Sequence, residues 1–232
     1  MSKFFILIMM FCGVQVCLAQ TEVVRKNKIT ALVTEKYSTI IAADKQIKHG
    51  LYQAMYNKKV VLAQGKYADD KRVGMWRFFD KKQRLLQVFN YDTGKLVFEA
   101  PEDETSNFRY QIESNTKDSI LITKPLKQGG RYFGYLPYLR FFKFPAELQG
   151  YDNDDVNVVI ALFITSMGQV AEFKMHIIAP YYKRTFTVDP NQLYPEDRTF
   201  RPATYNNEPI SSHIFISCYL NRNSELDMDT GN

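Results

Sequence analysis

Histidines and aspartates are the side chains of this chain best suited to chemistry, and their spacing fits neither a metal site nor a catalytic centre. His49, His176 and His213 lie far apart, whereas paired metal ligands usually lie a few residues apart on one element. The Asp-Asn-Asp-Asp run at 152–155 alternates like a calcium loop but lacks its glycine and distal glutamate. No phosphate-binding loop and no Gly-x-Ser-x-Gly turn occurs. We therefore expect a non-enzymatic protein that uses no metal and no cofactor.

The beginning of the chain has the layout of a secretory signal peptide. Lys3 precedes an apolar run from Phe4 to Val16, and Cys17-Leu18-Ala19 supplies small residues for a cleavage site. The run is short for a bilayer crossing, which needs about 20 residues. We expect cleavage after residue 19 and export to the periplasm or cell envelope, with a retained anchor as the alternative. Cleavage leaves Cys218 as the single cysteine, so no intramolecular disulfide can form.

Charge is divided unequally along the chain. Residues 20–100 carry 16 Lys/Arg and 8 Asp/Glu, a net charge of +8, whereas residues 101–232 carry 13 and 17, a net charge of −4. Such asymmetry indicates two modules. A basic exported module could bind anionic lipid, glycan or an acidic protein, although a solvated lysine-rich sheet face is the simpler interpretation. Export argues against a nucleic-acid partner, and membrane contact would be peripheral or through a retained anchor.

A repeat with an offset of 24 residues organises the N-terminal half. The aligned pairs are Gly50-Leu51-Tyr52-Gln53 with Gly74-Met75-Trp76-Arg77, Val61-Leu62 with Leu85-Leu86, and Tyr67 with Tyr91. A fixed period of this length is typical of stacked supersecondary units. Each unit is predicted to be two short strands, as in 76–79 and 84–91 around a turn at 80–83. Two units bury little surface, so residues 21–44 are expected to add a strand pair at 29–33 and 37–42.

The aromatic residues of this repeat allow two interpretations. Tyr52, Trp76 and Phe78 are either core aromatics of a small antiparallel sheet, which we favour, or an open aromatic face that docks a ligand, membrane or partner. The sequence motifs Gly-Lys-Tyr at 65–67 and Gly-x-Trp-x-Phe-Phe-Asp at 74–80 resemble the MORN-type repeats of bacterial exported proteins. The resemblance covers residues 45–98 and implies a β-repeat domain over residues 20–100.

The second half begins after an acidic, polar segment. Pro101–Ser106 has no apolar side chain beyond its proline, which suits a linker. Residues 108–112 and 119–123 then have strand character, so 101–124 is interpreted as a linker with extra strands. Beyond it, helix spacing of apolar residues over 131–143 predicts an amphipathic helix that Pro137 delays or kinks.

Three strands dominate the rest of the chain. Residues 156–165 are apolar on both faces, which predicts a central strand or one that meets a partner. Residues 170–178 alternate cleanly, which predicts a half-exposed strand. Residues 211–220 place Ile214, Ile216, Cys218 and Leu220 on one face, so the thiol is expected to be buried and inert. Residues 222–232 are expected to be a disordered tail.

The order of these landmarks over residues 125–221 resembles the C-terminal domain of the TonB energy-transducer family. The matching features are Gly129-Gly130, the amphipathic stretch, Phe144-Pro145, the two strands around Gly168, Phe200-Arg201-Pro202-Ala203 and the last strand. The family's helix before the aromatic-x-Pro-Ala segment is short or absent here, because Pro180, Pro190 and Pro195 interrupt residues 179–199. The predicted fold class is therefore α+β and strand-rich, with an N-terminal antiparallel β-repeat sheet followed by a small antiparallel sheet with one or two helices.

The TonB resemblance implies a function in binding extended peptides by strand-edge pairing. In that family the peptide belongs to an outer-membrane transporter. The implied partner-binding residues lie on the last strand: Ser211, His213, Phe215, Ser217 and Tyr219. Two alternatives stay open, namely TonB-type energy transduction if the N-terminal segment is a retained anchor, and a non-catalytic envelope scaffold that could be a homodimer.

Overall fold

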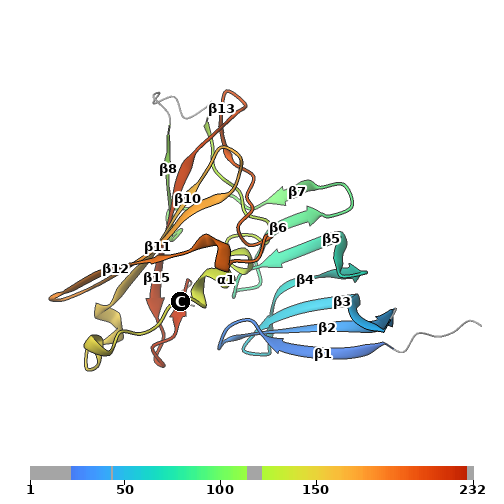
Figure 1. Ribbon diagram of the computed structural model, residues 1–232, viewed down its shortest axis with the longest axis horizontal. Helices are drawn as coiled ribbons and strands as arrows, with labels where there is room; N and C mark the ends of the chain where they lie inside the picture. Colours follow the sequence, from blue (N-terminus) through green and yellow to red (C-terminus); the bar gives the residue numbers. More distant parts are fainter. Residues whose placement is uncertain (1–21, 43, 114–121, 229–232) are drawn as a thin grey trace, which may run out of the picture.

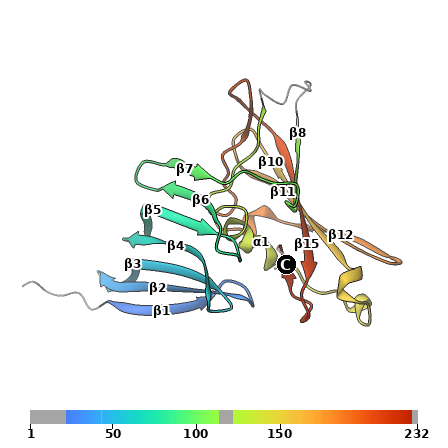
Figure 2. The same cartoon turned by 180° about the vertical axis from the view of Figure 1, so that it is seen from behind.

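Two antiparallel sheets meet at an angle in the computed structural model, which describes residues 22–42, 44–113 and 122–228 (Figure 1). The predicted signal peptide, residues 1–19, lies outside these residues. The chain is strand-rich, with 55% strand and 8% helix, so helices contribute little to the architecture. The larger sheet runs from blue to green in Figure 1 and contains the N-terminal repeat. The view from behind shows that the second sheet lies against one end of the strands of this larger sheet (Figure 2).

The first sheet is a meander in which each strand pairs with the next one along the chain. Its seven strands are β1 (Val23–Lys28), β2 (Val33–Ala42), β3 (Lys45–Tyr56), β4 (Val60–Ala68), β5 (Lys71–Phe79), β6 (Leu85–Asn90) and β7 (Lys95–Glu99). The predicted strands at 76–79 and 84–91 are confirmed as parts of β5 and β6. The ladders between β2 and β7 each contain a register shift, which bends and twists the sheet.

The predicted extra strand pair before residue 44 exists, but its first strand lies elsewhere. Residues 29–32 form the turn between β1 and β2 rather than a strand. The Thr30 hydroxyl accepts hydrogen bonds from the backbone N–H groups of Leu32 and Val33, at 3.3 and 3.1 Å. This local bonding stabilises a turn at apolar residues whose composition alone suggested a strand.

The second sheet has the order β12-β11-β10-β15-β16, and β8 also pairs with β15. Its strands are β8 (Phe108–Ile112), β10 (Asn157–Ile164), β11 (Val170–Ala179), β12 (Tyr182–Val188), β15 (Ser212–Leu220) and β16 (Leu226–Asp227). A small third sheet joins β9 (Ile122–Thr123), β13 (Ala203–Tyr205) and β14 (Glu208–Ile210). The strands expected at 108–112, 156–165, 170–178 and 211–220 are all present, within one or two residues at their ends.

The helix predicted over 131–143 is reduced to two short turns. A 3-10 turn, η2 (Phe133–Tyr135), runs into α1 (Leu136–Leu139), which has Pro137 in its first turn. The apolar stripe was nevertheless identified correctly, because Tyr132, Tyr135, Leu136 and Leu139 are buried. A proline amide cannot donate a hydrogen bond to the preceding turn, so a regular helix cannot extend across this position.

One continuous hydrophobic cluster joins the two sheets. Phe133 is the central contact, because its ring lies 5.7 Å from that of Phe78 and 6.3 Å from that of Tyr52. The disordered tail expected from residue 222 is wrong for its first part. Leu226 and Asp227 form β16 against β15, and Met228 is buried after them. The Asn107 side-chain amide donates to the Met228 carbonyl at 2.7 Å, so this segment is held from two sides.

Candidate binding site

The strand predicted to capture a peptide at its free edge is an interior strand. β15 pairs with β10 on one side, while β8 pairs with residues 212–216 and β16 with residues 219–220 on the other. Between these two partners, the Ser217 N–H donates to the Asn107 carbonyl at 2.9 Å. The prediction of an open edge at β15 is therefore wrong. Residues 107–112 and 226–227 of the chain itself occupy the place that a peptide would take.

The five residues predicted on that strand do not form one site. Ser211 precedes β15, and its carbonyl accepts a hydrogen bond from the Glu113 N–H at 3.2 Å. His213, Phe215 and Ser217 alternate with the buried stripe and lie on the open face of the second sheet. Tyr219 instead contacts the first sheet, because its hydroxyl receives a hydrogen bond from the Lys81 ammonium at 3.3 Å.

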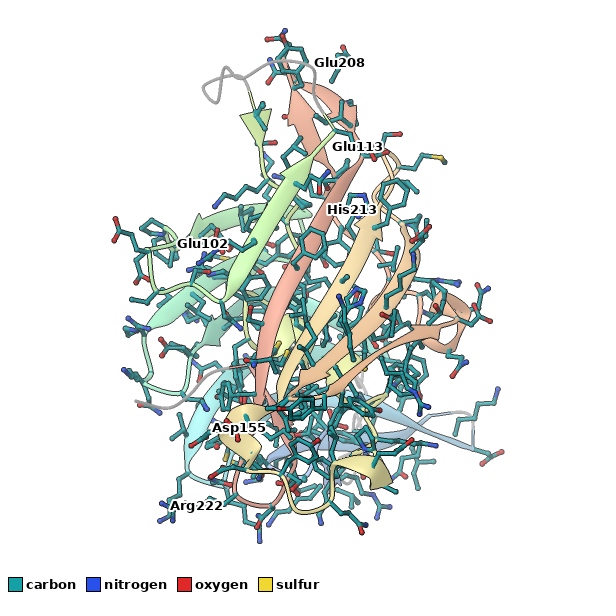
Figure 3. The ribbon with its side chains drawn as sticks, turned by 90° about the vertical axis from the view of Figure 1, so that its left-hand side faces the viewer. Glu102, Glu113, Asp155, Glu208, His213 and Arg222 are labelled. Carbon is teal, nitrogen blue, oxygen red and sulfur yellow. The ribbon has the colours of Figure 1, made fainter. Side chains whose placement is uncertain are left out.

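The open face of the second sheet carries a small aromatic cluster. The His213 ring lies 4.8 Å from that of Phe163 and 6.0 Å from that of Phe215. Glu113 lies beside His213, with 3.8 Å between Oε1 and Nε2, and Figure 3 looks onto both. On β11, a hydrogen bond from Lys174 lowers the pKa of Glu172. The open face of the second sheet thus combines half-buried aromatic rings with charged side chains. Such a surface can form side-chain contacts with a neighbouring strand or loop.

β12 is the edge strand at one end of this sheet, and the short strands β8 and β16 form the opposite edge. Its ladder with β11 runs without a register shift from Phe173–Val188 to Ala179–Tyr182. Among the strands that the structure describes, none pairs with the second side of β12. In both ribbon views β12 projects away from the seven-stranded sheet (Figures 1 and 2). Alternate backbone groups of an edge strand point outward, so β12 offers a straight row of donors and acceptors.

One face of β12 adds apolar and cationic contacts to this edge. The Arg184 guanidinium lies 5.9 Å from the ring centres of both Tyr182 and Phe186, and 3.0 Å from Oε1 of Glu147. Phe186 is 38% exposed, although its side chain lies in the row that faces the core. The buried hydroxyl of Tyr182 makes no hydrogen bond with any residue that the structure describes. Buried polar groups are normally paired, so this hydroxyl is an exception in the core-facing row of β12.

The second row of β12 is polar. Thr185 lies opposite His176, and its hydroxyl is 2.9 Å from the His176 Nδ1. Lys183 and Thr187 flank Thr185 on the same face. A strand added to β12 would therefore meet aromatic and cationic side chains on one face and hydroxyls on the other.

The aromatic face considered in the first sheet is core. Trp76 and Phe78 are fully buried and Tyr52 is 3% exposed, so none of them is a contact surface. Trp76 lies 5.0 Å from the Tyr52 ring and donates its Nε1–H to the Lys66 carbonyl at 3.2 Å. Burial also raises the pKa of Tyr52 above its usual value. The interpretation as sheet-core aromatics is the one that these positions support.

Comparison of the chain with protein-family models, with curated proteins and with solved structures found no match in any of the three. Within residues 22–42, 44–113 and 122–228, no group of three or more His, Cys, Asp or Glu side chains is placed to hold a metal ion. No helix in this described part of the chain is long and apolar enough to cross a bilayer.

Sequence reasoning missed β12 as the edge. Pro180 and Pro190 flank it and marked residues 179–199 as irregular. A usable signal was present between them, because Tyr182, Phe186 and Val188 recur at even spacing with threonines in between. Pro180 lies in the turn before the strand, where a missing N–H disturbs no ladder.

Proposed function

We propose that this protein is an exported, non-catalytic protein-binding module of the cell envelope that captures an extended peptide by strand addition at β12. The observation that carries the proposal is the edge strand β12, whose ladder with β11 is regular over seven residue pairs and whose second side is paired with none of the described strands. Strand addition draws its affinity from main-chain hydrogen bonds and its specificity from alternate side chains. The signal-peptide layout of residues 1–19 supports export.

The chemistry of β12 defines the peptide that it would accept. Its inward row should place an apolar residue against Phe186 and an acidic residue near Arg184, which lies between two rings. Its outward row should place small polar residues beside Thr185 and Thr187. The expected ligand is therefore an extended segment whose inward side chains are acidic and apolar and whose outward side chains are small and polar.

The resemblance to the C-terminal domain of the TonB family is part of this proposal. It makes a periplasmic segment of an outer-membrane transporter one member of the expected ligand class. Energy transduction would in addition require the N-terminal segment to stay in the membrane as an anchor. N-terminal sequencing of the exported protein distinguishes these two versions, because only cleavage near residue 19 removes the anchor.

A scaffold role is the second candidate, and the junction between the sheets favours it. Lys81 of the first sheet forms a 3.1 Å ion pair with Asp227 beside β15, and both side chains are more than 90% buried. Buried contacts of this kind hold the two sheets as one body, which is what a spacer between envelope partners requires. A scaffold would need no free edge, so the test below distinguishes the two roles.

Selection of short random peptides, followed by proline substitution, tests strand addition at β12. Amide N–H groups of consecutive strand residues point to opposite edges of the strand. Of the two variants Thr185→Pro and Phe186→Pro, one therefore removes an N–H group that points outward from the sheet, and it leaves the ladder with β11 intact. We expect selected peptides to lose binding, measured by fluorescence anisotropy, with that variant while its circular dichroism is unchanged. Lys26→Pro, in the edge strand β1, is the matched control and should bind normally. Unchanged affinity of the selected peptides for both the Thr185→Pro and the Phe186→Pro variant would contradict the proposal.

A further inference from the structure

The face of the seven-stranded sheet that points away from the aromatic core carries an ordered row of cations and amides. Successive register partners across five strands are Lys26 (β1), Lys36 (β2), Gln53 (β3), Gln64 (β4) and Arg77 (β5). Residues directly opposite in an antiparallel ladder project to the same face. Because Gln53 and Arg77 alternate with the buried Tyr52, Trp76 and Phe78, this row points away from the core. We call it the cation–amide row.

An apolar row runs beside it. Val24, Leu51, Val73 and Met75 line a trough of about 650 Å³ that also contains Lys36 and Arg77. Leu51 is 66% exposed, Val24 53% and Met75 40%. Exposed apolar side chains grouped with polar ones mark interaction surfaces. Lys66 lies between Leu51 and Val73 in the ladder, and Lys36 and Arg77 lie in the neighbouring row, so the trough presents apolar side chains next to cations.

The charge of this face is uncompensated. Within residues 22–42, 44–113 and 122–228, Lys26, Lys36, Lys66 and Arg77 form no ion pair. The carboxylate that lines the trough is Asp92 at its rim, whose Oδ1 accepts the Gly74 N–H at 2.8 Å. A partner on this face must therefore supply negative charge along one side and apolar groups along the other.

We propose that this face binds a second protein through an acidic amphipathic helix that lies across strands β1–β5. Neighbouring strands are about 4.8 Å apart, close to the roughly 5.4 Å rise of one helical turn. Carboxylates at i, i+3 or i+4 would thus face successive members of the cation–amide row, while the apolar stripe of the helix lies on Leu51 and Met75. Four strand spacings, about 19 Å, correspond to a helix of roughly 13 residues.

A helix fits this surface better than the other anionic partners. Apart from Asp92 at its rim, the residues that line the trough come from β1 to β5, so the trough extends across the strands in the direction that a helix lying across them would take. An extended strand would seek a backbone edge, and this face presents side chains. The site is separate from β12, so neither proposal depends on the other.

The test uses the full chain and a synthetic amphipathic peptide with one leucine stripe and one glutamate stripe, compared with its glutamate-to-glutamine counterpart. We expect the acidic peptide to bind at least about tenfold more tightly than the neutral one. Lys36→Gln/Arg77→Gln and Leu51→Ser/Met75→Ser should each weaken binding by about tenfold or more. Lys59→Gln/Lys143→Gln removes the same charge at two exposed positions away from the face and should leave binding unchanged.

Three results would overturn the proposal. The first is equal affinity for the acidic and neutral peptides. The second is equal weakening by the face and control variants, which would indicate general attraction to net charge. The third is binding of the chain to phosphatidylglycerol vesicles but not to the acidic peptide, which would assign the face to a membrane surface.

Discussion

The side chain of Gln87 holds the backbone of Gly129 across the junction of the two sheets. Its Oε1 accepts the Gly129 N–H at 2.9 Å and the Gly130 N–H at 3.2 Å, while its Nε2 donates to the Lys127 carbonyl at 3.0 Å. Gln87 is fully buried. A Cβ atom on Gly129 would come within 2.7 Å of the Gly134 Cα, so the doubled glycine allows the tight turn that presents these amides.

Replacing Gln87 with methionine should destabilise the protein strongly. The thioether keeps the volume of the side chain but leaves two buried N–H groups and one carbonyl without partners. Each such group costs about 1–3 kcal/mol, so we expect a loss of roughly 3 kcal/mol or more in the free energy of unfolding, measured by urea denaturation. Gln111→Met, at an exposed position on β8, is the matched control and should change stability little. Equal effects of the two substitutions would show that the Gln87 bonds are unimportant.

The sequence identified the doubled glycine as a landmark but not the residue that binds it. Gln87 lies in a strand whose other residues are mostly apolar, and a lone glutamine there is usually outward-facing. Its backbone partners Lys127 and Gly129 lie 40 and 42 residues away along the chain. Short-range periodicity carries no information on such pairing, so this contact could not be predicted from the pattern.

The same limit explains the error at β15. The alternation of Ile214, Ile216 and Cys218 predicted the strand and its buried face correctly. Whether that strand is an edge depends on β8 and β16, which pair with it through register contacts such as Arg109–Phe215 and Leu226–Leu220. β8 was predicted as a strand at 108–112 but without a partner, and residues 226–227 were expected to lie in a disordered tail. Several strands were therefore predictable from local pattern, whereas their order in the sheet was not.

Substituting Gly65 with alanine should disrupt the packing of Trp76. A Cβ atom at Gly65 would lie 2.3 Å from the indole ring, and Trp76 is fully buried between Tyr52 and Phe78. Overpacking of this kind typically costs about 1–3 kcal/mol, which a thermal or urea unfolding curve would detect. Tryptophan fluorescence should shift at the same time, because Trp76 is the single tryptophan of the chain.

Gly74→Ala is the comparison for Gly65→Ala. No atom lies within 4 Å of a Cβ added at Gly74, but its φ of +64° is one that alanine adopts with strain. We expect a cost of roughly 1–2 kcal/mol without a change in tryptophan emission. An unchanged emission spectrum for Gly65→Ala as well would contradict the predicted clash.

Lys127 should make stability depend on pH between 7 and 9. Burial lowers the pKa of its ammonium from 10.5 to about 7 in the folded protein. Between pH 7 and 9 the Lys127 side chain is therefore protonated in the unfolded chain and largely neutral in the folded one. The free energy of unfolding consequently increases as the pH is raised from 7 to 9. The slope contributed by one such group is at most about 1.4 kcal/mol per pH unit.

Lys127→Met isolates this effect. The variant keeps the buried apolar stem but loses the hydrogen bonds from Nζ to the Glu196 and Thr199 carbonyls, at 2.5 and 3.1 Å. Urea unfolding of both proteins from pH 7 to 9 should show a steeper rise for the native chain. The exposed Lys183→Met serves as control and should follow the native profile. Parallel profiles for the native chain and Lys127→Met would mean that the Lys127 pKa is not lowered on folding.

Breaking the ion pair between Lys81 and Asp227 should loosen the junction of the two sheets. The Lys81 ammonium lies 3.1 Å from Oδ2 of Asp227 and about 5–6 Å from three tyrosine rings, those of Tyr56, Tyr132 and Tyr219. Tyr132 donates its hydroxyl to Oδ1 of the same aspartate at 2.9 Å. Removing one partner leaves a buried charge, so Lys81→Met and Asp227→Leu should each cost about 3–5 kcal/mol in unfolding free energy.

The double substitution Lys81→Met/Asp227→Leu should cost clearly less than the two single losses combined, because no unpaired charge is then left in the junction. Urea denaturation of the four proteins gives the coupling energy directly. Lys174→Met, which breaks an exposed pair with Glu172, should leave stability nearly unchanged. Additive effects of the two junction substitutions would mean that the Lys81–Asp227 pair contributes no coupling energy of its own.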